Sequence, residues 1–90
     1  MKIEFDAAKN ERNIRERSLS FERAAEFDFE GAMIQEDVRN PYSEIRYVAT
    51  GFLGGRLHIL CFTPVEGGIR VISFRKANKR EVKYYESREN

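Results

Sequence analysis

Ninety residues, of which 41% are hydrophobic and 34% charged, provide for one small domain with a modest core, and we expect residues 1–90 to form it. No run approaches the roughly 18 apolar residues of a membrane-spanning helix. The N-terminus lacks the apolar region of a signal peptide, and the single cysteine, Cys61, excludes a disulfide framework and a cysteine-cluster metal site. The sequence therefore predicts a cytoplasmic protein that uses no metal, cofactor or membrane.

The first thirty residues contain one short strand and two helix signals. Residues Lys2–Phe5 alternate polar and apolar side chains, which is typical of an edge strand. Asp6 is suited to cap a helix over about Ala7–Arg17, and Ser20 is suited to cap a second helix. The second helix would bury a short apolar stripe made of Phe21, Ala24, Ala25 and Phe27.

From Ala32 onward the apolar period changes to two, which indicates strands. We expect four strands and a final helix, at about Met33–Arg39, Glu44–Leu53, Arg56–Thr63, Ile69–Arg75 and Lys79–Glu89. Gly54-Gly55 and Glu66–Gly68 supply two hairpin turns, and Asn78 with Glu81 has the spacing of a capping box. The order β-α-α-β-β-β-β-α predicts an α+β fold, with a mostly antiparallel sheet, two N-terminal helices on one face and a C-terminal helix.

The two hairpin turns also predict the register of the last three strands. The first turn pairs Gly51 with His58. The second pairs Phe62 with Val71, Leu60 with Ser73 and His58 with Arg75. The core face, under the N-terminal helices, would then carry Val48, Phe52, Leu57, Ile59, Cys61, Ile72 and Phe74. The open face would carry Tyr47, Ala49, Gly51, His58, Leu60, Phe62, Val71, Ser73 and Arg75. A shift of one residue would exchange the two faces.

The formal net charge of +1 conceals a strong separation of charge along the chain. Residues 19–37 carry a formal charge of −5, and residues 69–90 carry +4. A basic pole of this kind is the electrostatic footprint of a nucleic-acid partner, although ordinary surface charge gives the same composition. Its cations between residues 70 and 84 are Arg70, Arg75, Lys76, Lys79, Arg80 and Lys83.

A few residues near this pole are candidates for chemistry. His58 is the only side chain with an ordinary pKa near neutrality, although a single strand histidine is more often structural. Arg75 can hold a phosphate through two hydrogen bonds, or it can form a surface ion pair. Arg70 falls on the opposite face, where it either supports the site from the edge or is solvated. Of Tyr84 and Tyr85, one is expected to pack on the sheet and the other to be free to stack on a base.

Three segments carry a family resemblance: FDAAKNERNIRERSLSFERAAEFD, RYVATGFLGGRLHILCFT and IRVISFRKANKREVKYYE. Their most specific residues are Phe5, Asp6, Lys9, Asn10, Asn13, Ser20, Phe21, Arg70, Ile72, Ser73, Arg75, Ala77, Glu81 and Tyr85. Over about residues 3–86 the chain resembles the BrnT toxin family. That family often has proline where this chain has Ala7, a difference of little consequence for a helix start.

The resemblance implies a ribonuclease toxin of a type II toxin–antitoxin system with a RelE-like fold. It also implies a BrnA-like antitoxin with a ribbon-helix-helix DNA-binding segment. Toxin and antitoxin would form a hetero-oligomer that reaches operator DNA only through the antitoxin. Cleavage would need no metal, because the ribose 2′-OH attacks the adjacent phosphate while a base removes its proton. The alternative is a non-catalytic module that binds nucleic acid or protein through the basic pole.

Within this reaction the candidate residues take separate roles. We expect His58 to act as acid or base, Arg75 to stabilise charge on the phosphate, and Arg70 to support catalysis. The residues expected to contact RNA are Ser73, Lys76, Lys79, Arg80 and Tyr85.

Overall fold

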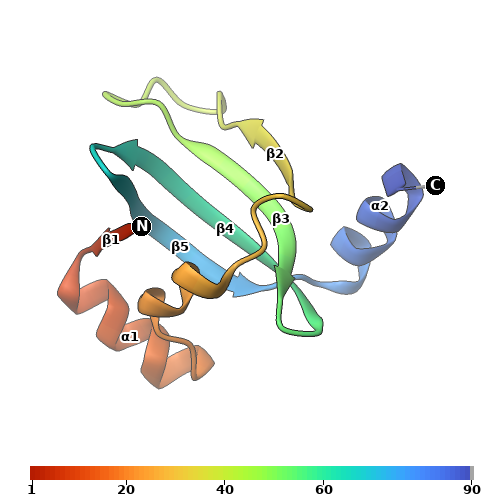
Figure 1. Ribbon diagram of the computed structural model, residues 1–90, viewed down its shortest axis with the longest axis horizontal. Coiled ribbons are helices and arrows are strands. Elements are labelled where there is room, and N and C mark those ends of the chain that lie inside the picture. The colour runs from red at the N-terminus through yellow and green to blue at the C-terminus, as the bar shows by residue number, and fades with distance from the viewer. Residues whose placement is uncertain (90) are drawn as a thin grey trace.

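A computed structural model describes residues 1–89, so Asn90, the last residue of the expected domain, lies outside the described residues. The fold is α+β, with one five-stranded sheet in the order β1-β5-β4-β3-β2 (Figure 1). β1 runs parallel to β5, and the other neighbours are antiparallel. The elements are β1 (Lys2–Phe5), α1 (Ala7–Arg17), a 3-10 helix η1 (Phe21–Glu26), β2 (Met33–Glu36), β3 (Tyr47–Leu53), β4 (Arg56–Val65), β5 (Gly68–Lys76) and α2 (Lys79–Glu89).

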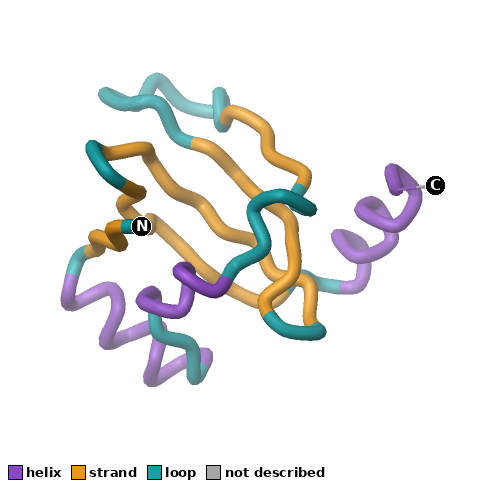
Figure 2. Tube along the Cα trace, viewed as in Figure 1, coloured by secondary structure: helices purple, strands orange, loops and turns teal. Residues whose placement is uncertain are grey.

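The expected α+β class, the mostly antiparallel sheet and the C-terminal helix are confirmed, but the expected order with two N-terminal α-helices is not, because there is one such helix. The second helix signal forms η1, a 3-10 helix of six residues. Ser20 caps it as expected, because its side chain accepts a hydrogen bond from the Glu22 amide. η1 ends early because Phe27 turns into extended backbone and its amide donates to Ala24. The segment crosses one face of the sheet and buries Phe21, Ala24 and Phe27 against it (Figures 1 and 2).

Two asparagines fix α1 against η1 and the sheet. The buried Asn13 donates from its side-chain amide to the carbonyls of Leu19 and Phe74, at 3.0 and 2.9 Å. Asn10 accepts a hydrogen bond of 2.7 Å from the Phe21 amide. α1 exposes most of its surface and has few apolar positions, so these side-chain bonds to backbone give it a defined place beside β5.

The β1–β5 pair joins the first strand to the last strand of the chain that the structure describes. Lys2 lies opposite Gly68 in the parallel register, and its amide donates to the Gly67 carbonyl at 3.0 Å. A Cβ atom at Gly68 would collide with the backbone of Lys2. Glycine is therefore required at this position for the N-terminal strand to approach.

The expected register is correct between β3 and β4 but wrong along much of β5. Gly51 faces His58 as predicted. A β-bulge opposite Cys61 and Phe62 leaves Ile72 unpaired, however, so His58 faces Lys76 and not Arg75. By the same shift Leu60 faces Phe74 and not Ser73. One extra residue in one strand exchanges the faces of all residues beyond it. Compared with a regular ladder, the bulge places Phe74 on the same face as Val71 and places Arg75 on the opposite face.

The assignment of core and open faces is also reversed. The main core lies on the face predicted to be open, where η1 covers a buried cluster that includes Ala49, Leu60, Phe62, Val71 and Phe74. Gly51 leaves room for Phe27, because a Cβ there would lie 2.8 Å from its ring, and it does not open a space beside the histidine. The face predicted to be core carries a smaller cluster near α2, made of Leu57, Ile59, Ala77 and Tyr85. No described helix is long and apolar enough to cross a membrane.

Candidate active site

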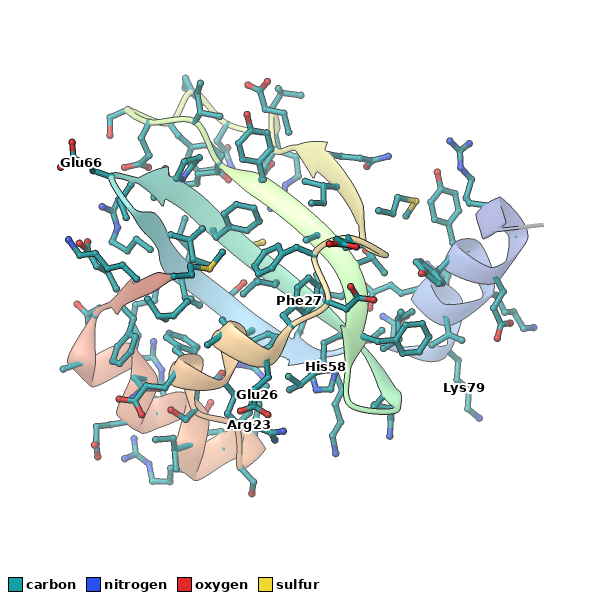
Figure 3. The ribbon with its side chains drawn as sticks, in the orientation of Figure 1. Arg23, Glu26, Phe27, His58, Glu66 and Lys79 are labelled. Carbon is teal, nitrogen blue, oxygen red and sulfur yellow. The ribbon has the colours of Figure 1, made fainter. Side chains whose placement is uncertain are left out.

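His58 lies near the start of β4, at the end of the sheet below η1 (Figure 3). Its residue surface is only 4% exposed, and its ring packs against Phe74 with 5.5 Å between centroids. Nδ1 lies 2.8 Å from the carbonyl oxygen of Arg56, an acceptor, so Nδ1 carries the proton and donates it in this bond. In the neutral ring Nε2 is then the unprotonated nitrogen, which is the atom that a general base needs.

The surroundings of His58 hold the imidazole neutral. Burial lowers the pKa of His58 below its ordinary value of 6.5, and the hydrogen bond to the backbone of Arg56 opposes this shift. The positive charges of Lys76, Arg56 and Arg23 lower the pKa further. A ring with a lowered pKa is a proton acceptor at neutral pH.

A pocket of about 680 Å³ opens beside His58, and we call it the cationic cleft. Its lining contains five cations and one carboxylate in addition to the histidine. The cations are Arg17, Arg23, Arg56, Arg75 and Lys76, the carboxylate is that of Glu16, and Ser18, Leu19 and Leu53 complete the wall. A concave surface with this excess of positive charge attracts a phosphodiester backbone.

Arg75 stands between the cationic cleft and a second pocket under α2. Its Nη1 and Nη2 each donate to Glu81, at 2.9 and 2.9 Å, and Nη1 also donates to the Lys76 carbonyl at 3.3 Å. The carboxylate of Glu81 raises the pKa of Arg75, and the guanidinium lowers the pKa of Glu81. Nε–H and one Nη2–H of Arg75 remain without a partner among the described residues, and they can bind a phosphate.

Glu81 holds Arg75 from the first turn of α2, where it also completes the predicted capping box. The Asn78 amide donates to Glu81 at 2.9 Å, and the Glu81 amide donates to the Asn78 side chain at 2.8 Å. The same carboxylate therefore fixes the start of α2 and the guanidinium of Arg75.

The second pocket, about 550 Å³ in volume, lies between the sheet and α2, and we call it the helix–sheet pocket. The sheet contributes Val48, Thr50, Ile59, Cys61, Ser73 and Arg75. Arg80, Glu81 and Tyr84 of α2 and Arg39 of the loop after β2 complete it. Because Arg75 lines both pockets, they are neighbours around one side chain.

The structure brings together some of the predicted residues and separates others. His58, Arg75 and Lys76 line the cationic cleft, and Ser73 and Arg80 line the helix–sheet pocket. His58 and Arg75 line the same cleft although the predicted register was wrong. Lys76 takes the predicted place of Arg75 opposite His58, and Arg75 reaches the cleft from the other face of the sheet.

Arg70, Lys79 and Tyr85 lie apart from this grouping. Arg70 sits toward the other end of β5 and donates to Glu44 at 3.1 Å, about 16 Å along the strand from Arg75 at the usual rise per residue. Lys79 points away from the sheet (Figure 3). Tyr85 is buried, and its hydroxyl donates to the Gly31 carbonyl at 2.9 Å, so its ring cannot stack on a base.

The sequence reasoning missed Arg17, Arg23 and Arg56 in the cationic cleft. Arg17 comes from the end of α1, where its Nη1 donates to the Asn13 side chain at 2.6 Å. The four cations of the α1 segment were a signal, but nearby acids offset part of their charge in a count of net charge. Arg23 lies among six acids in residues 19–37, so a count of net charge did not reveal it either. In the described part of the chain, no three His, Cys, Asp or Glu side chains gather as a metal site requires.

A third, smaller pocket extends the positive surface along α1. It has a volume of about 250 Å³ and shares Arg17 and Glu16 with the cationic cleft and Ser73 with the helix–sheet pocket. Lys9 and Arg12 add two further cations to it. The three pockets therefore form a connected track across one end of the sheet.

Comparison with known families gives one match. The model of a family described as the ribonuclease toxin BrnT of type II toxin–antitoxin systems matches residues 5–81. The search of curated proteins gave no match. The matched range contains both His58 and the Arg75–Glu81 pair.

Proposed function

Because the chain belongs to the BrnT family of ribonuclease toxins of type II toxin–antitoxin systems, we propose that it cleaves RNA in the cationic cleft. RNA is then the substrate, and an antitoxin is the partner that silences the toxin. The observation that carries the location is the pairing of His58, with Nδ1 tied to backbone, and five cations around one concave surface.

The proposed reaction begins with proton removal. Nε2 of neutral His58 takes the proton of a ribose 2′-OH, and the 2′-oxygen forms a bond to the adjacent phosphorus. The bond between phosphorus and the 5′-oxygen breaks, which leaves a 2′,3′-cyclic phosphate on one product and a 5′-OH on the other. The lowered pKa of His58 supports the role of base over that of acid.

The cations hold the phosphate and the charge that grows on it. Arg75 offers Nε–H and Nη2–H, and Glu81 keeps its side chain in place. Preorganised donors of this kind act most strongly on the crowded phosphorane, where charge is greatest. Arg17, Arg23 and Arg56 bind the neighbouring backbone.

Lys76 is proposed as the proton donor to the leaving 5′-oxygen. It is the cross-strand partner of His58, so both side chains start from one face of the sheet. Its ammonium gives a proton to the 5′-oxygen as the bond to phosphorus breaks. Arg70 takes no part in this scheme, because it is held by Glu44 toward the other end of β5.

The family resemblance supports several finer proposals. The partner is a BrnA-like antitoxin with a ribbon-helix-helix segment, the fold is RelE-like, and residues 1–90 act as one domain in the cytoplasm. The complex is a hetero-oligomer that meets operator DNA through the antitoxin alone. The chemistry above has a base, a proton donor and charge stabilisation without a metal ion, so cleavage is proposed to proceed in EDTA.

Cleavage of a short RNA by the purified toxin in EDTA tests the scheme. We expect His58→Ala to reduce kcat by about 10²–10⁴, as for a general base, and Arg75→Ala by about 10²–10³, as for a charge-stabilising donor. Arg70→Ala removes a cation from the same strand outside the cleft, and we expect it to cleave almost normally. Circular dichroism and antitoxin binding check that each variant is folded.

A substrate with a bridging sulfur at the 5′ position separates base from acid. A thiolate leaves without protonation, so Lys76→Ala should approach the wild-type rate on this RNA while His58→Ala stays slow. Full activity of both His58→Ala and Arg75→Ala would show that cleavage occurs elsewhere. A folded wild-type toxin that binds RNA but never cleaves it would favour the non-catalytic binding module.

A further inference from the structure

We propose that the helix–sheet pocket binds the base of a nucleotide next to the scissile phosphate and so gives the toxin a sequence preference. This inference rests on the proposed function, because it places the phosphate at Arg75. It assigns a ligand to a pocket that the cleavage scheme leaves unused.

The floor of the pocket is built from two cross-strand rows. Val48, Cys61 and Ser73 form one row, and Thr50, Ile59 and Arg75 form the other. The bulge at Ile72 gives Ser73 and Arg75 these places, since a regular ladder would have turned both toward the main core. The result is a floor about three strands wide, on which the apolar side chains of Val48, Ile59 and Cys61 suit a flat aromatic ring.

Two hydroxyl groups on this floor have free hydrogen-bonding capacity. Neither Thr50 Oγ1 nor Ser73 Oγ has a hydrogen bond among the described residues. No fully buried side-chain oxygen or nitrogen in the described chain lacks a partner, so both hydroxyls are accessible to solvent, and both residues line the pocket. A hydroxyl can donate or accept, and it can therefore contact the edge of a base.

Tyr84 supplies a ring on the α2 side of the pocket. It is 49% exposed, whereas its neighbour Tyr85 is buried. A half-exposed aromatic ring beside an apolar floor is a stacking surface for an unpaired base. The expectation that one of these tyrosines is free to stack therefore falls on Tyr84.

The arginines around the pocket, together with the Arg75 side chain that it shares with the cationic cleft, favour RNA as its occupant. Arg80 and Arg39 stand with Arg75 around the apolar floor, and Glu81 and Asp37 each already bind one of these arginines. Arg75 also lines the cationic cleft, so a nucleotide chain can place a phosphate there and the attached base under α2. One side chain then links phosphate binding to base recognition.

The test uses a short RNA with one abasic position, moved nucleotide by nucleotide along the strand. Cleavage is measured as kcat/KM, and binding is measured by fluorescence anisotropy with a 2′-deoxy nucleotide blocking the cut. Loss of one stacked base weakens binding by about 5- to 150-fold. For wild type we expect this loss at one position next to the cut. Tyr84→Ala should bind intact RNA as weakly as wild type binds the RNA that lacks this base. Removal of the base at that position should not weaken binding by Tyr84→Ala any further.

Three variants complete the design. Tyr84→Phe keeps the ring and should behave as wild type. Lys83→Ala is the matched control, because it removes an exposed cation of α2 that does not line the pocket. The double variant Thr50→Val with Ser73→Ala should alter which base is preferred while keeping the abasic effect. It retains the floor's volume at position 50 and adds no buried polar group.

The outcomes separate this proposal from the proposed function. If Tyr84→Ala matches wild type on intact RNA and keeps the same abasic position, the pocket does not bind a base. If Tyr84→Ala weakens only antitoxin binding, the pocket is a protein-binding surface and the proposal is overturned. A toxin that binds the blocked RNA with the expected abasic effect but cleaves nothing would refute the cleavage scheme alone.

Discussion

At the scale of single residues, the site depends on how each nitrogen of His58 is used. The bond to the Arg56 carbonyl fixes the ring and its tautomer, and burial against Phe74 keeps it neutral. The sequence identified this histidine as the only side chain with an ordinary pKa near neutrality. Its burial depends on packing against Phe74, which could not be predicted from composition. As the proposed base, the ring can accept a proton at neutral pH without first losing one.

The pH dependence of cleavage follows from the lowered pKa of His58. The rate should stay level through pH 7 and fall about tenfold per pH unit only below the folded-state pKa, which lies under 6.5. The measurement is kcat/KM between pH 4.5 and 8 with the short RNA. An acid limb centred above 6.5 would contradict the assignment of His58 as base.

The same shift links pH to stability. The unfolded chain binds a proton at His58 near pH 6.5 while the folded chain does not, so stability falls as pH drops from about 6.5 to the folded-state pKa. Urea unfolding over this pH range should show a free energy of unfolding that falls as the pH drops in wild type but not in His58→Gln. This control separates loss of the base from loss of the fold.

At the scale of elements, much of the fold could be predicted from sequence and one bulge could not. Polar caps, glycine turns and the two-residue period located almost every element, and the tight turn at Gly54-Gly55 gave the β3–β4 register. Both faces of β4 are apolar, however, so the pattern could not decide which face η1 covers. Nothing in the local pattern near Ile72 predicts an extra residue in β5.

Deletion of the bulge tests its role. Without Ile72 the pairs of Cys61 with Ser73 and Leu60 with Phe74 can persist, so every side chain keeps its face. We expect the Ile72 deletion to unfold cooperatively, with reduced stability, and to cleave RNA. Deletion of Cys61 removes a residue from the paired strand and turns one half of β4 over, so it should abolish cooperative folding.

Thermal unfolding followed by circular dichroism distinguishes these two variants, and the cleavage assay reports on the site. Equal loss of folding in both would mean that the bend produced by the bulge is itself essential. In that case the twist of β5, and not only its register, would position Arg75.

At the scale of the whole molecule, positive charge is gathered from distant parts of the chain. The connected track of three pockets has nine cations, contributed by α1, η1, the sheet, α2 and the loop after β2. They are Lys9, Arg12, Arg17, Arg23, Arg39, Arg56, Arg75, Lys76 and Arg80. A count along the sequence finds only the C-terminal part of this track, because folding brings α1 beside β5.

The salt dependence of RNA binding tests the contribution of α1. Each lost phosphate contact lowers the slope of log K against log salt by about 0.7 for a single strand. Arg17→Ala should show this change, because Arg17 lines two of the three pockets. Arg15→Ala is the matched control, since Arg15 is exposed on the same helix and lines none of the three.

Anisotropy titrations of the blocked RNA between 50 and 300 mM salt would give the three slopes (~six concentrations each suffice for a linear fit). Equal slopes for wild type and Arg17→Ala would mean that Arg17 makes no phosphate contact and would exclude it from the RNA-binding surface. Equal reductions for Arg15→Ala and Arg17→Ala would mean that α1 acts through general charge and not through the track.

The parallel pairing of β1 with β5 has a consequence for how the toxin is made. Translation produces β1 before α1, η1, β2, β3 and β4, and its partner β5 only after them, so β1 stays unpaired while these elements are made. Arg75 and Lys76 are synthesised later still. The cationic cleft, the proposed site of cleavage, is therefore complete only once β5 has been made and paired, and a nascent chain that stops before Lys76 has no complete cleft.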